Sequence, residues 1–220
     1  ILTAENPLKN YQRPEIKDIT LKADDGTPLY GKIILPTDFD ANKKYPVIVY
    51  LYNGPHAQLI TNSFPASGNL WYEFMAQRGY IVFTMDGRGS SNRGLKFEQA
   101  VFRHLGEVEM SDQLKGVEYL KSLPYVNAEK LGIHGWSFGG FQTQYTMYTS
   151  PDVFAAGIAG AGPTEWENYN SWYSGRTIGK VDRSKPNLRR YSLLPLTAGL
   201  KKPLMLVHGM QDPNVLYQDT

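Results

Sequence analysis

The segment Gly135-Trp136-Ser137-Phe138-Gly139-Gly140 decides how this chain folds. The apolar stretch 131–134 comes directly before it, and a stretch that can form a helix, 141–145, follows it. A strand must therefore turn sharply into a helix at Ser137, and glycines on both sides leave room for that turn. The turn projects the Ser137 hydroxyl outward, and the helix points its N-terminal N–H groups at the place where negative charge would develop. We interpret Ser137 as a nucleophile; the alternative is a glycine-rich turn in which a serine occurs by chance.

Strands and helices alternate along the rest of the chain, after an antiparallel hairpin near its start. Strands are indicated by alternating or continuous apolar runs, and a helix by apolar residues at helical spacing. The expected hairpin covers 16–36, the expected strands 46–52, 80–85, 130–134, 155–161 and 203–208, and the expected helix 106–123. Together with the serine turn, this order predicts the α/β class and the α/β-hydrolase fold, in which helices cover both faces of a mostly parallel sheet.

Composition narrows the functions that this chain can have. Its 220 residues can bury a full core, and we expect residues 1–220 to form a single domain. The formal net charge of +2 is too small to indicate nucleic acid or an anionic membrane as a partner. The sequence contains no cysteine, which excludes disulfides, thiolate catalysis and cysteine-bound zinc. No run of about 18 apolar residues indicates a membrane span, and no motif indicates a cofactor or a metal.

An acid and a base are needed to activate a serine nucleophile. Asp212 follows the expected strand 203–208, at the position where this fold carries the acid of its triad; the alternative is an ordinary Asp-Pro turn. The triad histidine comes after the acid in this fold, but no histidine follows Asp212. His208 is expected to form local hydrogen bonds, and His134 to be buried beneath the serine turn. The general base is therefore expected beyond Thr220.

Four further segments have distinctive sequences. They are Tyr50-Leu51-Tyr52-Asn53-Gly54-Pro55, Asp86-Gly87-Arg88-Gly89-Ser90, Trp166-Glu167-Asn168-Tyr169 with Tyr173, and residues 208–215. Together with the serine turn they resemble, in order, five motifs of the prolyl oligopeptidase family of serine peptidases, and in particular of its dipeptidyl peptidase IV-like members. The resemblance covers roughly residues 30–220. It implies that this chain is the C-terminal catalytic domain of such a peptidase, truncated before the catalytic histidine and lacking the family's N-terminal β-propeller.

The resemblance also assigns roles near the nucleophile. The phenol of Tyr52 and the backbone N–H of Phe138 would donate hydrogen bonds to the oxyanion. Taken without the resemblance, Tyr52 is more typical of a core tyrosine. Asp86 and Arg88 are expected to organise a loop near the site and to take no part in the chemistry.

A substrate pocket is implied in the same way. Its apolar wall would suit a proline or alanine, and its members would be Trp166, Tyr169, Tyr173 and Val215. Without the resemblance, such an aromatic cluster is more typical of a core. Tyr169 and Tyr173 would share one face of a helix if their stretch is helical. Asn214 would bind a backbone carbonyl of the substrate.

The implied activity is the release of N-terminal dipeptides with proline or alanine in the penultimate position, through an acyl-enzyme on Ser137. A peptide is the expected substrate, and the chain as given is expected to be inactive because it lacks the base. An acyl-peptide hydrolase or an esterase would use the same turn and acid, so both stay open, as does a non-catalytic binding domain. The resemblance further implies a periplasmic or extracellular location and a homodimeric full-length protein.

Overall fold

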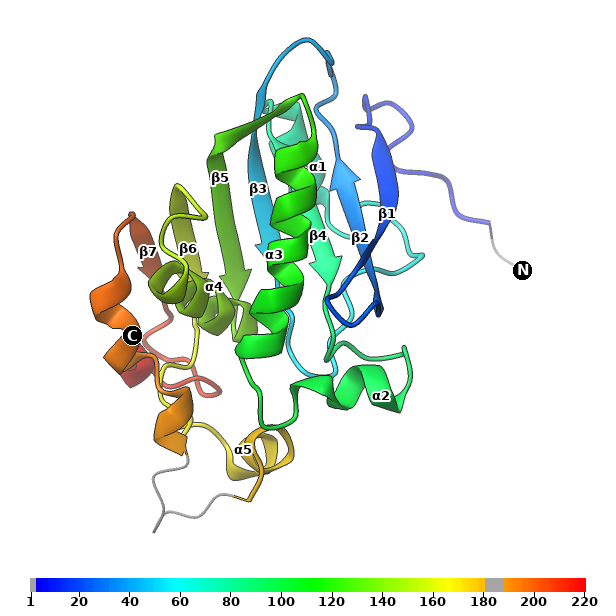
Figure 1. The fold of residues 1–220 in the computed structure, drawn as a ribbon. Coiled ribbons are helices and arrows are strands. Elements are labelled where there is room, and N and C mark those ends of the chain that lie inside the picture. The colour runs from blue at the N-terminus through cyan, green and yellow to red at the C-terminus, as the bar shows by residue number, and fades with distance from the viewer. Residues whose placement is uncertain (1–2, 181–187) are drawn as a thin grey trace.

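A computed structural model describes residues 3–180 and 188–220 (Figure 1). Within these residues, one sheet of seven strands has the order β1-β2-β4-β3-β5-β6-β7. The strands are β1 (Ile16–Lys22), β2 (Pro28–Ile34), β3 (Tyr45–Leu51), β4 (Ile81–Asp86), β5 (Val126–Trp136), β6 (Ala156–Gly160) and β7 (Leu204–Val207). β1 and β2 form the expected antiparallel hairpin, and β2 also pairs antiparallel with β4. The remaining pairs are parallel, from β4 through β3, β5 and β6 to β7.

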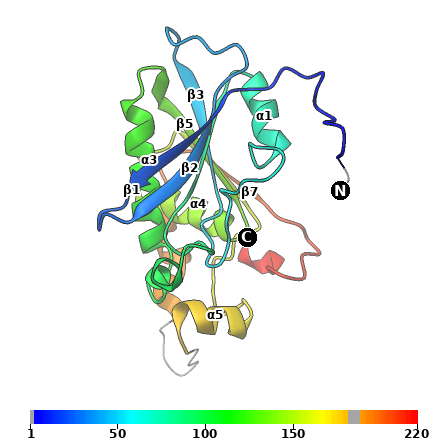
Figure 2. The same ribbon diagram turned by 90° about the vertical axis from the view of Figure 1, so that its right-hand side faces the viewer.

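Helices cover both faces of this sheet. They are α1 (Leu70–Gln77), α2 (Leu95–Glu98), α3 (Glu107–Ser122), α4 (Phe138–Thr149) and α5 (Ser171–Ile178), with short 3-10 helices at Gln99–Val101, Leu188–Tyr191, Leu194–Gly199 and Tyr217–Asp219. α3 and α4 lie on one face and α1 on the other, as the two views show (Figures 1 and 2). The predicted mostly parallel sheet with helices on both faces is confirmed. In the part of the chain that the structure describes, none of the helices is both long and apolar enough to cross a membrane.

The core lies between the central strands and α3. Every second residue of β3 is buried, and all six residues of β4 are buried, as expected for strands covered on both faces. Gly116 brings α3 close to the sheet, because a Cβ at that position would lie 2.8 Å from the ring of Phe83. Burying a side chain of this size stabilises the fold by up to about 3 kcal/mol. The contact fixes α3, and the side chains that it carries, on the sheet.

The β7 end of the sheet is covered on one face only. Gly157 of β6 faces α4, where a Cβ would lie 3.0 Å from Met147. Neighbouring residues of a strand point to opposite faces, so Ile158 points away from α4. Ile158 pairs with Met205 of β7, and these side chains are 42% and 60% exposed. Trp136, at the end of β5, is also exposed. Apolar side chains therefore face water at this end of the sheet.

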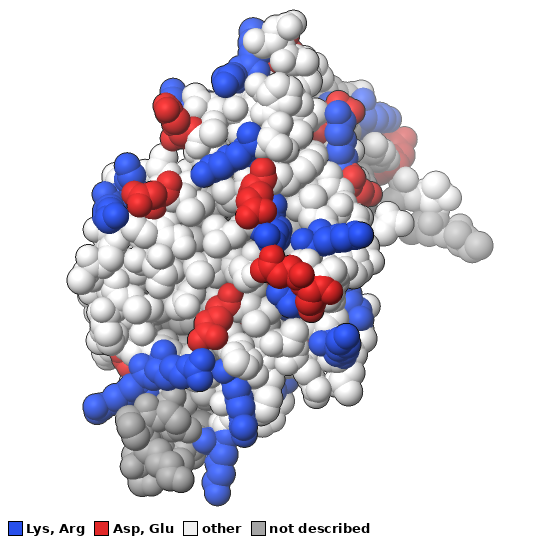
Figure 3. Space-filling model, in the orientation of Figure 1, with Lys and Arg blue, Asp and Glu red and all other residues white. Residues whose placement is uncertain are grey.

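Charged side chains of both signs are interspersed on the face that carries α3 (Figure 3). Some of them form ion pairs between elements: Lys115 of α3 lies 2.9 Å from Asp24, and Arg190 lies 2.9 Å from Glu107. Surface pairs of this kind contribute about 0–1 kcal/mol each. The fold therefore depends mainly on its apolar core.

Candidate active site

The backbone at Ser137 has a conformation that few residues other than glycine adopt. β5 ends at Trp136 and α4 begins at Phe138, so Ser137 alone forms the turn between them. Its φ is 57°, in the left-handed region. The N–H of Ser137 donates to the carbonyl oxygen of Gly160 at 2.8 Å, which fixes the turn to β6. The predicted strand–turn–helix sequence is present, with Ser137 at its tightest point.

Steric crowding explains why the residues around Ser137 are glycines. A Cβ at Gly135 would lie 2.3 Å from the carbonyl oxygen of Gly139. A Cβ at Gly139 would lie 2.4 Å from the carbonyl oxygen of Leu51, the last residue of β3. The strand, the turn and the first turn of α4 therefore pack backbone against backbone, and a side chain at either position would push them apart.

A small pocket lies at Ser137. It is lined by Ser137 itself and by Tyr52, Phe138, Pro163, Trp166, Tyr169 and Tyr173. Its volume of about 20 Å³ is enough for a single water molecule. The structure thus brings the serine together with the predicted aromatic residues, which come from distant parts of the sequence.

The aromatic wall of this pocket is built from three rings. Trp166 and Tyr173 are stacked, with ring centroids 5.9 Å apart and an interplanar angle of 8°. Tyr169 meets both rings edge-on, at centroid distances of 5.7 and 5.3 Å. Trp166 is 1% exposed, and burial raises the pKa of the Tyr173 phenol far above its usual value. The Tyr173 hydroxyl therefore stays neutral, and the wall presents an apolar surface.

Tyr169 and Tyr173 do not share a helical face, because the condition for it, a helix that includes both residues, is not met. α5 begins only at Ser171, and Asn170 is its N-cap, with its side-chain oxygen accepting from the N–H of Tyr173 at 2.8 Å. A capping residue is non-helical, so Tyr169 lies outside the helix. The two rings meet because the chain turns at the cap.

Two hydrogen-bond donors flank the serine. Tyr52 directly follows the last residue of β3, and its half-buried ring lies 6.4 Å from that of Phe138, measured between centroids. Phe138 is the first residue of α4, and the first N–H groups of a helix have no partner within it. Both residues line the pocket of Ser137. A phenol and a helix N-terminal N–H thus lie on residues that share the pocket of Ser137.

Asp212 lies in the loop that follows β7. Its Oδ1 accepts hydrogen bonds from the backbone N–H groups of Asn214 at 2.9 Å and Val215 at 3.1 Å. These N–H groups lower the pKa of the Asp212 carboxyl, which is therefore ionised at neutral pH. Asn214 Oδ1 accepts from the hydroxyl of Tyr169 at 3.3 Å, so the Asp212 loop touches the aromatic wall.

The loop after β7 reaches the aromatic wall through Asn214. Val215 is buried, but the residues that line the pocket of Ser137 do not include Val215, Asn214 or Asp212. The predicted site residues after β7 thus lie beside the small pocket, not in its lining.

The histidines all have partners other than Ser137. His208 uses Nε2 toward the carbonyl oxygen of Val215 at 2.9 Å and Nδ1 toward the hydroxyl of Thr220, so its expected local bonding is confirmed. The remaining contacts are His56 with Glu98, His104 with Glu107, and His134 with the carbonyl oxygen of Ile158. His134 is half-buried, so the prediction of burial beneath the turn is wrong, because the face of β5 that carries it is only partly covered.

Asp86 anchors a loop at the end of β4. Its two carboxylate oxygens accept from the backbone N–H groups of Leu59 at 2.8 Å and Ile60 at 3.0 Å. Arg93 donates to the same carboxylate at 2.9 Å. Asp86 is 2% exposed and therefore serves the structure of the loop, as predicted.

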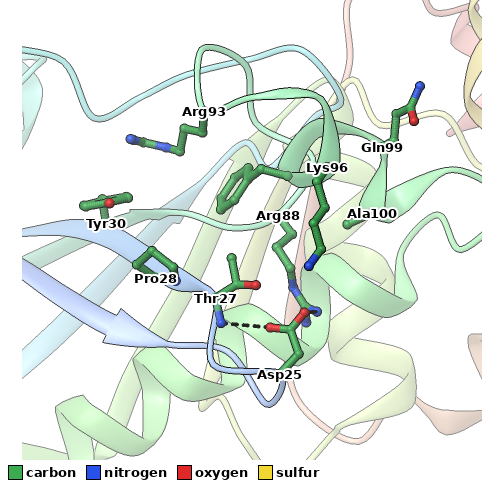
Figure 4. Close-up of a pocket in the computed structure, with 10 residues that line it drawn as sticks. Asp25, Thr27, Pro28, Tyr30, Arg88, Arg93, Lys96, Gln99 and Ala100 are labelled. Atoms are coloured by element: carbon green, nitrogen blue, oxygen red, sulfur yellow. Dashed lines mark hydrogen bonds and ion pairs between the residues drawn. The ribbon is translucent and has the colours of Figure 1, made fainter.

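Arg88 lines a second cavity, of about 550 Å³, between the β1–β2 hairpin and the segment around α2 (Figure 4). Its guanidinium donates to Asp112 at 2.7 Å and to Asp25 at 3.0 Å. Asp112 belongs to α3 and is completely buried. The charge of Arg88 is thus matched by carboxylates, which confirms its predicted role in organising a loop.

Sequence reasoning missed one residue of the pocket at Ser137 and a buried pair beyond that pocket. Pro163 lines the pocket of Ser137. Asn53, which follows Tyr52, is bonded to the buried side chain of Gln113. A lone proline and a helical glutamine give no local signal, because their partners are distant in the sequence.

The parallel sheet, the helices on both faces and the strained serine turn at a strand end define an α/β-hydrolase. Residues 68–220 match the family described as the prolyl oligopeptidase family. The chain belongs to this family.

Individual proteins of known name are also similar to this chain in sequence. Over 227 residues the chain is 36% identical to dipeptidyl peptidase 8 of Mus musculus, with all of this chain and 25% of the relative covered. It is 33% identical over 221 residues to prolyl endopeptidase FAP of Homo sapiens, with 98% and 28% covered. The chain thus spans about a quarter of the length of the curated relatives it matches.

Two solved structures are similar to this chain in fold as well as in sequence. A protein of Bacteroides ovatus, provisionally assigned as a dipeptidyl aminopeptidase IV, superposes with a TM-score of 0.95 at 47% identity; 100% of this chain and 31% of that chain are covered. Dipeptidyl peptidase 4 of Porphyromonas gingivalis superposes with a TM-score of 0.87 at 32% identity, with 96% and 30% covered. The fold described above is therefore that of these enzymes over the matched region.

Proposed function

We propose that residues 1–220 belong to the catalytic domain of a serine peptidase and that Ser137 forms the acyl-enzyme. The observation that carries the proposal is the strained turn that places Ser137 between an aromatic pocket and the N-terminus of α4. A backbone strained at one serine, with donors on both sides, suits nucleophilic attack on a carbonyl. The names of the relatives, which are dipeptidyl peptidases and a prolyl endopeptidase, support a peptide as the substrate.

The chemistry follows from the groups around the serine. Ser137 Oγ attacks the carbonyl carbon of the scissile bond and gives its proton to a base, and the C–N bond then breaks as the base protonates the leaving amine. A water molecule next attacks the acyl-enzyme and releases the product that carries the new carboxyl group. The carbonyl oxygen becomes negative in both steps, and the N–H of Phe138 and the phenol of Tyr52 stabilise it. One such donor is worth about 3 kcal/mol in the transition state.

The base is proposed to be a histidine outside residues 1–220, because the four histidines of this chain hydrogen-bond to other groups. Asp212, ionised at neutral pH, would orient that imidazole and stabilise its protonated form. On this proposal the 220-residue chain alone does not turn over substrate. The homodimer and the periplasmic or extracellular location stay predictions.

Specificity is proposed to come from the ring wall. Trp166 and Tyr173 are stacked and Tyr169 stands edge-on to both, and the three rings form an apolar wall suited to a proline ring or an alanine methyl. The pocket of Ser137 is small, which favours a compact side chain over a bulky one. The backbone N–H of Asn214 already donates to Asp212, and the side-chain amide of Asn214 would turn from Tyr169 toward a substrate carbonyl. We propose release of N-terminal dipeptides with proline or alanine in the penultimate position.

Endopeptidase action is the second candidate, favoured by the similarity to prolyl endopeptidase FAP. The two are separated by offering the full-length protein Gly-Pro-nitroanilide with a free or an acetylated amino terminus. Turnover of the free form alone supports dipeptide release, and turnover of the acetylated form supports the endopeptidase. A fluorophosphonate probe should label the wild type and Ser122→Ala, whose serine is exposed on α3, but not Ser137→Ala. Equal labelling of Ser137→Ala would contradict the assignment of the nucleophile.

A further inference from the structure

The turn after β3 is tied to α3 by two buried side chains. Gln113 Nε2 donates to Asn53 Oδ1 at 2.9 Å and to the carbonyl oxygen of Met85 at 3.0 Å. Gln113 and Asn53 are each 4% exposed. Met85 is the penultimate residue of β4, so Gln113 joins Asn53 both to a helix and to the centre of the sheet.

Stability alone does not account for this pair. Asn53 Nδ2 and Gln113 Oε1 are buried and have no hydrogen-bond partner among the described residues. A buried polar group without a partner costs about 1–3 kcal/mol. An apolar pair of the same size would avoid that cost, so the hydrogen bond is best explained by the position that it gives to Asn53.

Asn53 lies two residues after the end of β3. Its φ of 53° lies in the left-handed region, which asparagine tolerates better than most residues. The next residue, Gly54, supports the ring of Tyr52, since a Cβ at Gly54 would lie 2.3 Å from Tyr52 Cε1. The location of the Tyr52 ring therefore depends on the turn that Asn53 makes.

We propose that Gln113 is a positioning residue for the oxyanion donor: by holding Asn53, it fixes the turn against which the Tyr52 ring packs. The inference rests on the proposed function, because it takes the Tyr52 phenol as a donor to the oxyanion. Gln113 itself does not line the pocket of Ser137 and acts only through the turn.

The test is made on the full-length protein with a Gly-Pro-nitroanilide substrate. Gln113→Met removes the hydrogen bonds and keeps the length of the side chain. It should lower kcat about 10- to 100-fold, the loss expected when a catalytic group is displaced by about 1 Å, and change KM by less than about 2-fold. Gln142→Met is the matched control, since Gln142 is also buried, donates to the carbonyl oxygen of Gly106 at 3.3 Å, and also has an unpaired Oε1.

A second background separates positioning from general damage. In Tyr52→Phe the phenol is absent, so adding Gln113→Met should lower kcat by less than about 2-fold further, while the melting temperature still falls. Full additivity of the two changes, or a loss of kcat in Gln142→Met equal to that in Gln113→Met, would overturn the inference. Normal kcat in Gln113→Met together with a large loss in Tyr52→Phe would overturn it and leave the proposed function standing. Normal kcat in Tyr52→Phe would remove the oxyanion role and this inference together.

Asn53→Gly removes the other partner of the same hydrogen bond. It also keeps the inference testable if Gln113→Met does not fold. Glycine adopts the positive φ of this position readily, so the turn can form, but the hydrogen bond to Gln113 is lost. The expected result is again a fall in kcat with little change in KM. Wild-type kcat in Asn53→Gly would overturn the inference.

Discussion

One methyl group added in the first turn of α4 is expected to have a large effect on stability and kcat. In Gly139→Ala the new Cβ would lie 2.4 Å from the carbonyl oxygen of Leu51 and 3.1 Å from the Cα of Tyr52. A carbon–oxygen contact is normally about 3.3 Å or longer, so the overlap is about 0.9 Å. Both obstructing atoms belong to the backbone, so no side-chain rotation can relieve the overlap. Either α4 or the end of β3 has to move.

The free-energy cost of this movement follows from the known effects of overpacking a core. Overpacking in a core costs about 1–3 kcal/mol and occasionally more, and an obstruction by backbone belongs at the upper end. A loss of about 3 kcal/mol in a domain of this size lowers the melting temperature by roughly 6–12 °C. Because the displaced backbone includes Tyr52, kcat should fall as well.

The assay is calorimetry of the full-length protein, followed by steady-state kinetics on the same sample. Gly175→Ala is the matched control, because Gly175 lies in α5 and a Cβ there would meet no atom within 4 Å. Alanine is better than glycine inside a helix by about 0.5–1 kcal/mol, so this control should melt at the same temperature or higher. A Gly139→Ala protein with wild-type melting temperature and wild-type kcat would refute the steric argument.

Three further outcomes are expected. Ser137→Ala should lower kcat by several orders of magnitude with folding intact, which kinetics and circular dichroism on one preparation would check. Tyr52→Phe should lower kcat roughly 10²- to 10³-fold with KM little changed; near-normal kcat with a lower melting temperature would instead indicate a core tyrosine. Burial raises the pKa of Glu109, whose side chain is fully buried. The folded state therefore keeps that proton more tightly than the unfolded state, and stability falls as pH rises above about 4.3. Glu109→Gln should raise the melting temperature at pH 8 and leave it unchanged below pH 4, whereas the exposed Glu118→Gln should change neither.

The parts of the molecule that the sequence predicted are those with local signals. The strand, the glycines and the helix around Ser137 lie within residues 131–140, and Gly135, Gly139 and Gly140 leave no room for a Cβ in the structure. β3 and β4 were predictable because strands covered on both faces are continuously apolar.

The parts that the sequence did not predict depend on which distant segments of the chain pack against a residue. The bond between Asn53 and Gln113 joins residues 60 positions apart, and neither position is unusual in its own segment. His134 was expected to be buried because it lies in a central strand, but its exposure is set by how much of that face is covered. Tyr169 and Tyr173 were placed on one face only on condition that a helix includes both, and the helix begins two residues after Tyr169.

The end of the sheet at β7 has a consequence for the behaviour of these residues in solution. Within the described residues β7 is one of the two edge strands, and Met205 in it and Ile158 beside it expose apolar surface. An open strand edge flanked by apolar side chains is a template on which another strand can add, from the same polypeptide or from a neighbouring molecule. Strand addition between molecules depends on concentration, whereas addition within one polypeptide does not. Association of residues 1–220 through this four-residue strand would therefore increase with protein concentration.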